Sequence, residues 1–172
     1  GSVTITGTNT FLIESNNIEN TITAYHLGYI LGPRINAGGR VGKSSHGANL
    51  LLNNNSQETF KLASELNNYN KERQILEGNL LNEILNTDYQ NHSEPVVILH
   101  GENWHEGVIG IIAARVKEKF NKPTIIISVS SEIGKGSGRS IHGFDMGSAI
   151  IGAVQSNLLI KGGGHKMAAG FS

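Results

Sequence analysis

The sequence predicts an α/β fold with a mixed, largely parallel sheet flanked by helices and preceded by one long helix. Two short apolar runs rich in β-branched residues, PVVILH at 95–100 and PTIIISV at 123–129, are typical of buried strands. The amphipathic segment 108–120 between them predicts a helix, and strand–helix–strand units of this spacing form right-handed crossovers between parallel strands. The periodic segment 57–85 predicts the long helix.

The segment before the long helix is expected to hold an amphipathic helix followed by a loop. The helix spans 20–31, with Asn20 as its N-cap. Gly32 and Pro33 are expected to end it, because proline disfavours a helical conformation at the preceding residue. A loop rich in glycine and arginine is then expected at 32–42.

The long helix has the clearest periodicity in the chain. A short helix at 46–52, capped by Ser45, is expected to precede it. Side chains three and four positions apart within 57–85 form one stripe, made of Leu62, Leu66, Tyr69, Arg73, Leu76, Leu80 and Ile84. At 1.5 Å per residue the helix is about 40 Å long, and so narrow a stripe favours a connector between two lobes over a plain packed helix.

The last third of the chain is expected to add a third strand at 137–142 and a helix at 146–155. A further strand begins near Gly170, where the sequence stops, so we expect the protein to continue beyond both ends of this sequence. Gly1 and Ser2 are typical of what remains after a tag is cleaved.

Composition excludes several kinds of site. The 172 residues carry no net charge and no cysteine, which excludes disulfides and thiolate metal sites. No apolar run has the length of a membrane span and no signal peptide is visible, so a cytoplasmic location is expected. With only two aspartates, Asp88 and Asp145, the chain lacks the converging carboxylates of a two-metal hydrolase, and no metal or other cofactor is expected within it.

The first chemical motif is GPRINAGGR at 32–40. Arg34 and Arg40 present paired donors that match phosphate oxygens, and Asn36 can donate or accept beside them. The alternative is a helix-terminating loop with surface arginines.

The second motif, GENWHEGVIGIIAAR, follows a strand and opens a helix, where free N–H groups capture anions. Trp104 is suited to stacking on a base and His105 to binding a phosphate. Gly107 and Gly110 let the start of the helix lie close to a neighbour or ligand. The alternatives are a core or lid aromatic for Trp104 and a structural role for His105.

The third motif is GKGSGRSIHG at 134–143. Ser137, Arg139 and Ser140 offer hydroxyl and guanidinium donors between glycines. If this segment is extended, Ser137 and Arg139 point to the same face and form a phosphate pincer, because strand side chains alternate. A polar hairpin is the alternative.

The fourth motif is GGGHKMAAG at 162–170, which we expect to be a glycine-rich loop suited to an anion. His165 presents a ring nitrogen beside the N–H groups that Gly163 and Gly164 leave accessible, and Ala168 and Ala169 allow tight packing behind it. A bland turn is the alternative.

Taken together and in this order, four segments resemble the C-terminal half of RecJ-type single-strand-specific exonucleases, which belong to the DHH phosphoesterase superfamily. The segments are GPRINAGGR, WHEGVIGIIAAR, GSGRS and GGGHKMAAG. The resemblance implies a tag remnant and the tail of the DHH domain at 1–50, a connecting helix region at 51–91 and a C-terminally truncated DHH-associated domain at 92–172. Such enzymes bind manganese or magnesium through their DHH domain. Its Asp-His-His run is absent from this sequence, so this fragment alone is expected to be inactive.

The resemblance also implies roles for individual residues. Ser137 and Arg139 would bind the 5′-terminal phosphate of single-stranded DNA, helped by Arg34 or Arg40. His165 and the glycines before it would approach the scissile phosphate or a neighbouring one, with His165 as the catalytic residue. Trp104 and His105 would line the cleft.

The resemblance implies that this chain grips single-stranded DNA as one half of a 5′-to-3′ DNA exonuclease used in repair and recombination. The missing DHH domain would be its partner. Two alternatives stay open. One is a phosphodiesterase for short oligonucleotides or cyclic dinucleotides, and the other is a non-catalytic module that binds nucleic acid or tRNA ends. The oligomeric state is left open by the sequence.

Overall fold

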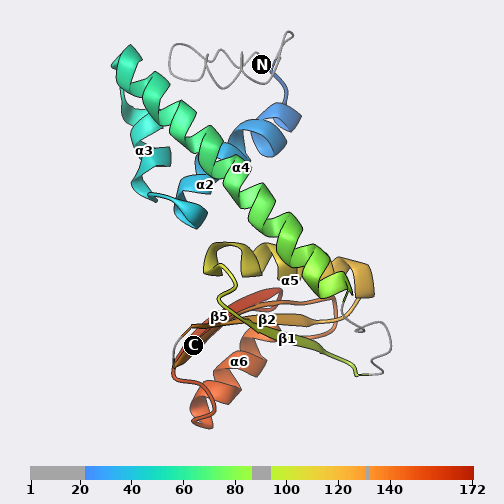
Figure 1. Cartoon of the computed structure of the whole chain (residues 1–172). Coiled ribbons are helices and arrows are strands. Elements are labelled where there is room, and N and C mark those ends of the chain that lie inside the picture. The colour runs from blue at the N-terminus through green and yellow to red at the C-terminus, as the bar shows by residue number, and fades with distance from the viewer. Residues whose placement is uncertain (1–21, 87–93, 131) are drawn as a thin grey trace. The chain divides into compact units, whose positions relative to one another are not determined.

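The computed structural model describes residues 22–86, 94–130 and 132–172. Its elements in chain order are η1 (His26–Leu31, a π-helix), α2 (Gly32–Val41), α3 (Ser45–Leu52), α4 (Ser56–Asn86), β1 (Val97–Glu102), α5 (Glu106–Phe120), β2 (Thr124–Ser130), β3 (Ile133–Arg139), α6 (Met146–Gln155), β4 (Gly162–His165) and β5 (Ala168–Phe171) (Figure 1). The chain divides into two compact units, 1–75 and 76–172, and the boundary falls within α4.

In the N-terminal unit, helical structure continues through Gly32-Pro33. The expected loop at 32–42 is wrong, because α2 begins at Gly32 directly after η1. Pro33 lies in the first turn of α2, where its fixed φ is already suited to a helix. The N–H of Gly32 donates to the carbonyl of Leu27, the five-residue spacing of a π-helix. The expected N-cap Asn20 lies outside the described residues.

Glycines in and after α2 allow close packing. A methyl group added at Gly38 would lie 2.6 Å from the carbonyl oxygen of Lys43. One added at Gly42 would lie 2.4 Å from the ring of Tyr69. Both separations are shorter than van der Waals contact. These two glycines are therefore explained by packing within the unit, without an anion.

The two helices that follow match the expected ranges closely. α4 begins and ends within one residue of the predicted 57–85. The expected cap at Ser45 is wrong, because α3 begins at Ser45 and its N-cap residue Ser44 makes no side-chain capping bond. Asn55 caps α4 instead, since its Oδ1 accepts from the N–H groups of Gln57 and Glu58 at 2.9 and 3.2 Å. None of the described helices combines the length and apolarity that a membrane span requires.

A small apolar core holds the N-terminal unit together. Its buried members are Leu31, Leu50, Ala63 and Leu66, with Ile35, Leu62 and Tyr69 packed against them. The stripe predicted on the long helix thus supplies this core with Leu62, Leu66 and Tyr69.

The C-terminal unit contains a five-stranded mixed sheet in the order β1-β2-β3-β5-β4. The α/β class and the mixed sheet are as expected, but the expectation of a largely parallel sheet is wrong. Only β1 and β2, joined through α5, are parallel, and the other three pairs are antiparallel. The sequence pattern reveals the strand–helix–strand unit, but two tight connections, β2 to β3 and β4 to β5, reverse the chain direction.

The two faces of the sheet are covered unequally. α5 and α6 lie on opposite faces (Figure 1). The core on the α5 side contains residues from α4, β1, α5 and β2: Leu80, Ile84, Leu99, Val108, Ile109, Ile112, Ala113, Val116 and Ile126. The core on the α6 side is smaller and contains Met146, Ile150 and Ala169, with Ile125, Phe144, Leu159 and Phe171 packed against them. Strands β5 and β4 are therefore packed mainly from the α6 side.

Strand β3 begins earlier and ends earlier than the predicted 137–142. Its alternate glycines explain the error, because glycine usually weakens a strand. Gly136 and Gly138 point to the α6 face, where added methyl groups would lie 2.0 Å from the ring of Phe171 and 2.7 Å from Sδ of Met146. Larger neighbours therefore fill the space that these glycines leave.

The expected glycine-rich loop at 162–170 is also wrong, because it is a hairpin of β4 and β5. Lys166 and Met167 form its turn. The start of α6 packs so closely on this hairpin that a methyl group at Gly147 would lie 3.0 Å from the backbone of His165. The N–H of Met146 also donates to the carbonyl of Lys166 at 3.0 Å.

Candidate nucleic-acid interface

Ser137 and Arg139 share one face of β3, as the alternation of strand side chains predicts. Nη1 of Arg139 donates to Oγ of Ser137 at 3.0 Å and to the carbonyl of Gly138 at 2.8 Å. Both residues are half-buried. The guanidinium and the hydroxyl therefore form one polar pair on the α5 side of the sheet.

Helix α5 approaches this pair through Gly110. A methyl group added there would lie 2.9 Å from Nη2 of Arg139 and 3.0 Å from Oγ of Ser137. The sequence predicts that Gly110 lets the start of this helix lie close to a neighbour, and the neighbour is this polar pair. Any larger side chain at position 110 would have to displace it.

The register of the sheet places His165 on the same face. Arg139 pairs with Ala168, and Ala168 pairs with His165. Side chains of directly paired residues lie on one face of a sheet. Neighbouring strands lie about 4.8 Å apart, so the Cα atoms of Arg139 and His165 are about 10 Å apart.

Arg139, Ala168 and His165 form one row of paired residues across the three strands, and a second row lies beside it. Ser137 pairs with Gly170, and Gly170 pairs with Gly163. Between the polar pair and His165 the surface therefore carries only small residues, and a methyl group at Gly163 would meet nothing within 4 Å. A hollow of about 350 Å³ lies beside Gly163 and Gly170. We call these two rows, Ser137, Gly170, Gly163, Arg139, Ala168 and His165, the open face.

The ring of His165 is exposed and oriented by the turn of the hairpin. Its Nδ1 accepts a hydrogen bond from the N–H of Met167 at 3.3 Å. In the neutral ring the proton is then on Nε2, which can donate to a ligand. Gly164 pairs with Ala169 and so belongs to the opposite face, where only its backbone is available.

His105 occupies the N-cap position of α5 and is exposed. Its Nδ1 accepts from the N–H of Gly107 at 3.0 Å, so the neutral ring likewise carries its proton on Nε2. The next residue, Glu106, accepts from Nζ of Lys135 on β3 at 2.7 Å. The structural role that the sequence left open for His105 is therefore present, and it leaves Nε2 available.

Trp104 packs within the C-terminal unit. A methyl group at Gly101 would lie 2.2 Å from its ring, and Trp104 packs against the core on the α5 side. Its Nε1 donates to Glu83 at 3.2 Å, and its carbonyl accepts from Oγ of Ser128. These contacts favour the alternative of a core or lid aromatic over base stacking.

Ser140 directly follows β3, but its side chain does not lie on the open face. It is 1% exposed, and its hydroxyl donates to the carbonyl of Phe144 at 2.7 Å. Its predicted contact with phosphate stays a prediction that this burial does not favour.

Arg34, Asn36 and Arg40 lie on α2 in the N-terminal unit. Arg34 is half-buried, and its Nε and Nη1 donate to Asn67 at 3.0 Å and to the carbonyl of Ile30 at 2.7 Å. Burial, and secondarily repulsion from Arg73, lowers the pKa of Arg34 below its usual value. Asn36 and Arg40 are exposed. The structure thus distinguishes the two arginines: Arg34 binds within its own unit, and Arg40 faces solvent.

The residues described here do not form a metal site. Within residues 22–86, 94–130 and 132–172, no three histidine, aspartate or glutamate side chains converge. A manganese or magnesium ion of the kind that the family resemblance implies therefore does not fit these residues.

Among the small members of the open face, the sequence singles out Ala168 only for packing and does not single out Gly170. The alternation of small residues along AAGF is the signal that marks them. That signal is interpretable only once the hairpin register is known.

The C-terminal unit matches a known family. The model of the DHHA1 domain matches residues 93–172. This segment is therefore similar to the DHHA1 domain, the DHH-associated domain of the resemblance. It contains the whole sheet and all of the open face.

Comparison over the whole chain gives the same result. The chain is 40% identical over 166 residues to the single-stranded-DNA-specific exonuclease RecJ of Salmonella typhimurium, covering 92% of this chain and 29% of that protein. It also resembles two crystal structures of RecJ from Thermus thermophilus. The Mn²⁺ complex has a TM-score of 0.82 at 31% identity, covering 97% of this chain and 24% of that chain. The Mg²⁺ complex has a TM-score of 0.83 at 29% identity, covering 97% and 26%.

The predicted resemblance to RecJ is therefore confirmed, and the mixed α/β fold with its preceding long helix agrees with these structures. The chain spans under a third of the length of the RecJ proteins named above. The division of the chain at residues 50 and 91 stays a prediction.

Proposed function

We propose that this chain is the substrate-gripping part of a 5′-to-3′ exonuclease that degrades single-stranded DNA in repair and recombination. The proposal rests on the similarity to RecJ over nearly the whole chain and on the chemistry of the open face. We also propose a cytoplasmic location for this chain.

The open face is the observation that carries the proposal. Arg139 and Ser137 supply charged and hydroxyl donors at one end, and His165, whose Cα lies about 10 Å from that of Arg139, supplies an N–H donor at the other. The two ends therefore suit different phosphates of a strand that lies over the small residues. Arginine–phosphate pairs are charge-assisted and bidentate, which suits recognition of a terminal phosphate.

We assign roles accordingly. Arg139 and Ser137 bind the 5′-terminal phosphate, and His165, beside Gly163 and the backbone of Gly164, contacts the phosphate at the bond to be cleaved. His105 adds a donor through Nε2 at the start of α5.

Metal-dependent cleavage belongs to the longer protein in this proposal. The RecJ structures that this chain resembles contain Mn²⁺ or Mg²⁺, and the described residues here do not converge on such an ion. We propose that the DHH domain of the same protein supplies the metal ligands, and that this chain binds DNA but does not cleave it.

The test is fluorescence anisotropy with a short single-stranded DNA, either 5′-phosphorylated or 5′-hydroxyl, in the presence of a chelator. We expect the chain to prefer the phosphorylated end and the Arg139→Ala variant to lose that preference. Because the chain has no net charge, we also expect a shallow salt dependence, with a log–log slope of roughly one per phosphate contacted. Equal binding of both ends by the unaltered chain would contradict the assignment of Arg139 and Ser137.

The two alternatives predict different results. A phosphodiesterase for short oligonucleotides or cyclic dinucleotides would bind a dinucleotide at least as tightly as a longer strand. A non-catalytic module would support no cleavage even when a DHH domain and Mn²⁺ are supplied.

A further inference from the structure

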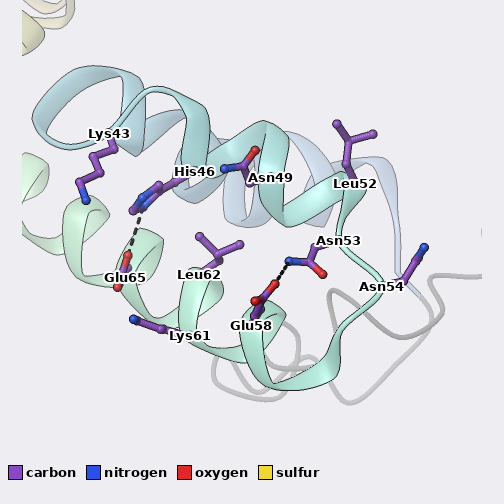
Figure 2. A pocket seen from close by; sticks show the side chains of 10 residues that line it. All are labelled: Lys43, His46, Asn49, Leu52, Asn53, Asn54, Glu58, Lys61, Leu62 and Glu65. Carbon is purple, nitrogen blue, oxygen red and sulfur yellow. Dashed lines mark hydrogen bonds and ion pairs between the residues drawn. The ribbon is translucent and has the colours of Figure 1, made fainter.

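A second hollow lies in the N-terminal unit, between α3 and the first turns of α4, and has a volume of about 620 Å³ (Figure 2). This is within the range typical of small-molecule sites. Its wall is formed by Lys43, His46, Asn49, Leu52, Asn53, Asn54, Glu58, Lys61, Leu62 and Glu65. None of these residues belongs to the open face.

Two lysines and two glutamates line this hollow, so its formal charge is zero. Glu58 accepts from Nδ2 of Asn53 at 2.6 Å, and Glu65 lies 3.2 Å from Nδ1 of His46. The ammonium groups of Lys43 and Lys61 have no hydrogen bond or ion pair with any described residue. Figure 2 shows both lysines at the end of the hollow where His46 meets Glu65. That end therefore offers two ammonium groups to an anionic ligand, beside the carboxylate of Glu65.

His46 adds a buried polar atom to the same end. The residue is only 9% exposed, and its Nδ1 has no hydrogen bond within the described structure. Although Oε2 of Glu65 is 3.2 Å away, the two groups are not oriented for a hydrogen bond. A buried ring nitrogen without a partner is costly, and a ligand that donates to it or accepts from it would remove that cost.

The hollow also has apolar and amide groups in its lining. Leu52, which is 79% exposed, and the half-buried Leu62 both line it. Asn49 and Asn54 line it too, and each amide offers a donor and an acceptor. Exposed apolar surface beside amide groups suits a flat heterocycle, because asparagine matches the N6 and N7 edge of adenine.

We propose that this hollow binds a nucleoside monophosphate. The phosphate lies between Lys43 and Lys61 beside His46, and the base lies against Leu52 and Leu62 with its edge toward the asparagine amides. This site is separate from the open face and does not rest on the exonuclease proposal. A nucleotide site would also let an enzyme that releases nucleotides respond to their concentration.

The test is titration of the full chain with 2′-deoxyadenosine 5′-monophosphate, followed by two-dimensional ¹H–¹⁵N NMR. We expect saturable shifts at residues 43–65, and at least fivefold weaker binding in the Lys43→Gln/Lys61→Gln double variant. The Lys71→Gln variant is the matched control, because Lys71 is an exposed lysine of α4 outside the hollow. It should bind as the unaltered chain does.

Two further ligands test the division of the hollow. Inorganic phosphate should compete at higher concentration than the nucleotide, and 2′-deoxyadenosine should bind more weakly still. Equal binding of nucleotide and inorganic phosphate would overturn the proposed base site. Absence of saturable shifts at 43–65, or equal loss of binding in Lys71→Gln, would overturn the proposal as a whole.

Discussion

Gly110 of α5 lies directly against Arg139 of β3. A methyl group at position 110 would approach Nη2 of Arg139 to 2.9 Å and Oγ of Ser137 to 3.0 Å. Helix packing and the proposed phosphate recognition therefore depend on the same glycine.

We expect Gly110→Ala to displace the guanidinium and weaken the preference for a 5′-phosphate by about 1 kcal/mol, or about fivefold, as expected for one impaired charge-assisted hydrogen bond. The measurement is the ratio of the dissociation constants for 5′-phosphorylated and 5′-hydroxyl DNA. Gly152→Ala is the matched control, because a methyl group there meets nothing within 4 Å. It should keep the ratio and raise stability by up to about 1 kcal/mol. An unchanged ratio in Gly110→Ala would disprove its positioning role.

Ser137 and Ser140 should respond to substitution in opposite ways. Ser137→Ala removes a hydroxyl of the open face, so we expect weaker binding of phosphorylated DNA with little change in unfolding temperature. Ser140→Ala removes the buried donor to Phe144, so we expect a loss of about 1–2 kcal/mol of stability with the end preference retained. Thermal unfolding and anisotropy on both variants separate the two roles. Loss of end preference in a folded Ser140→Ala would restore the predicted phosphate contact of Ser140.

His105 has a capping role and a proposed DNA-binding role, which two substitutions can separate. His105→Ala removes the acceptor for the N–H of Gly107, and the loss of an N-cap costs about 1 kcal/mol. His105→Asn restores the cap but not the ring, so stability should return while DNA binding stays reduced. Full recovery of DNA binding in His105→Asn would show that His105 acts only as a cap.

Substitution of Arg34 and of Arg40 should have different effects on stability. Arg34→Ala removes donors to Asn67 and to the carbonyl of Ile30, and we expect a loss of about 1–3 kcal/mol in the stability of the N-terminal unit. Arg40→Ala should leave stability within about 0.5 kcal/mol, because substitutions at exposed positions usually do. Chemical denaturation measures both. If the two variants lost equal stability, the distinction drawn between these arginines would be incorrect.

The sequence by itself determined those features that depend on local periodicity. The long helix is within one residue of its predicted range, and the range predicted for the helix after Asp145 is correct. The shared face of Ser137 and Arg139 also follows from the alternation of strand side chains. The ordered motifs led to the RecJ resemblance.

Tertiary structure decided the role of the glycines. The sequence allows Gly136 and Gly164 to belong to loops, because glycine is compatible with turns. In the fold both belong to strands, where the ring of Phe171 and the atoms of Ala169 fill the space of the missing side chains. Pro33 was misread for a related reason, since proline at the start of a helix looks locally like proline that ends one.

Only the tertiary structure could bring the chemical motifs together or keep them apart. The register of β3, β5 and β4 places His165 on the face of Arg139, though 25 residues separate them in the sequence. The same packing places the ring of Trp104 against Gly101 and buries the hydroxyl of Ser140. Residue type determines what a side chain can bind, but strand register and packing decide which side chains reach the same surface, because those contacts form between segments that are distant in the chain.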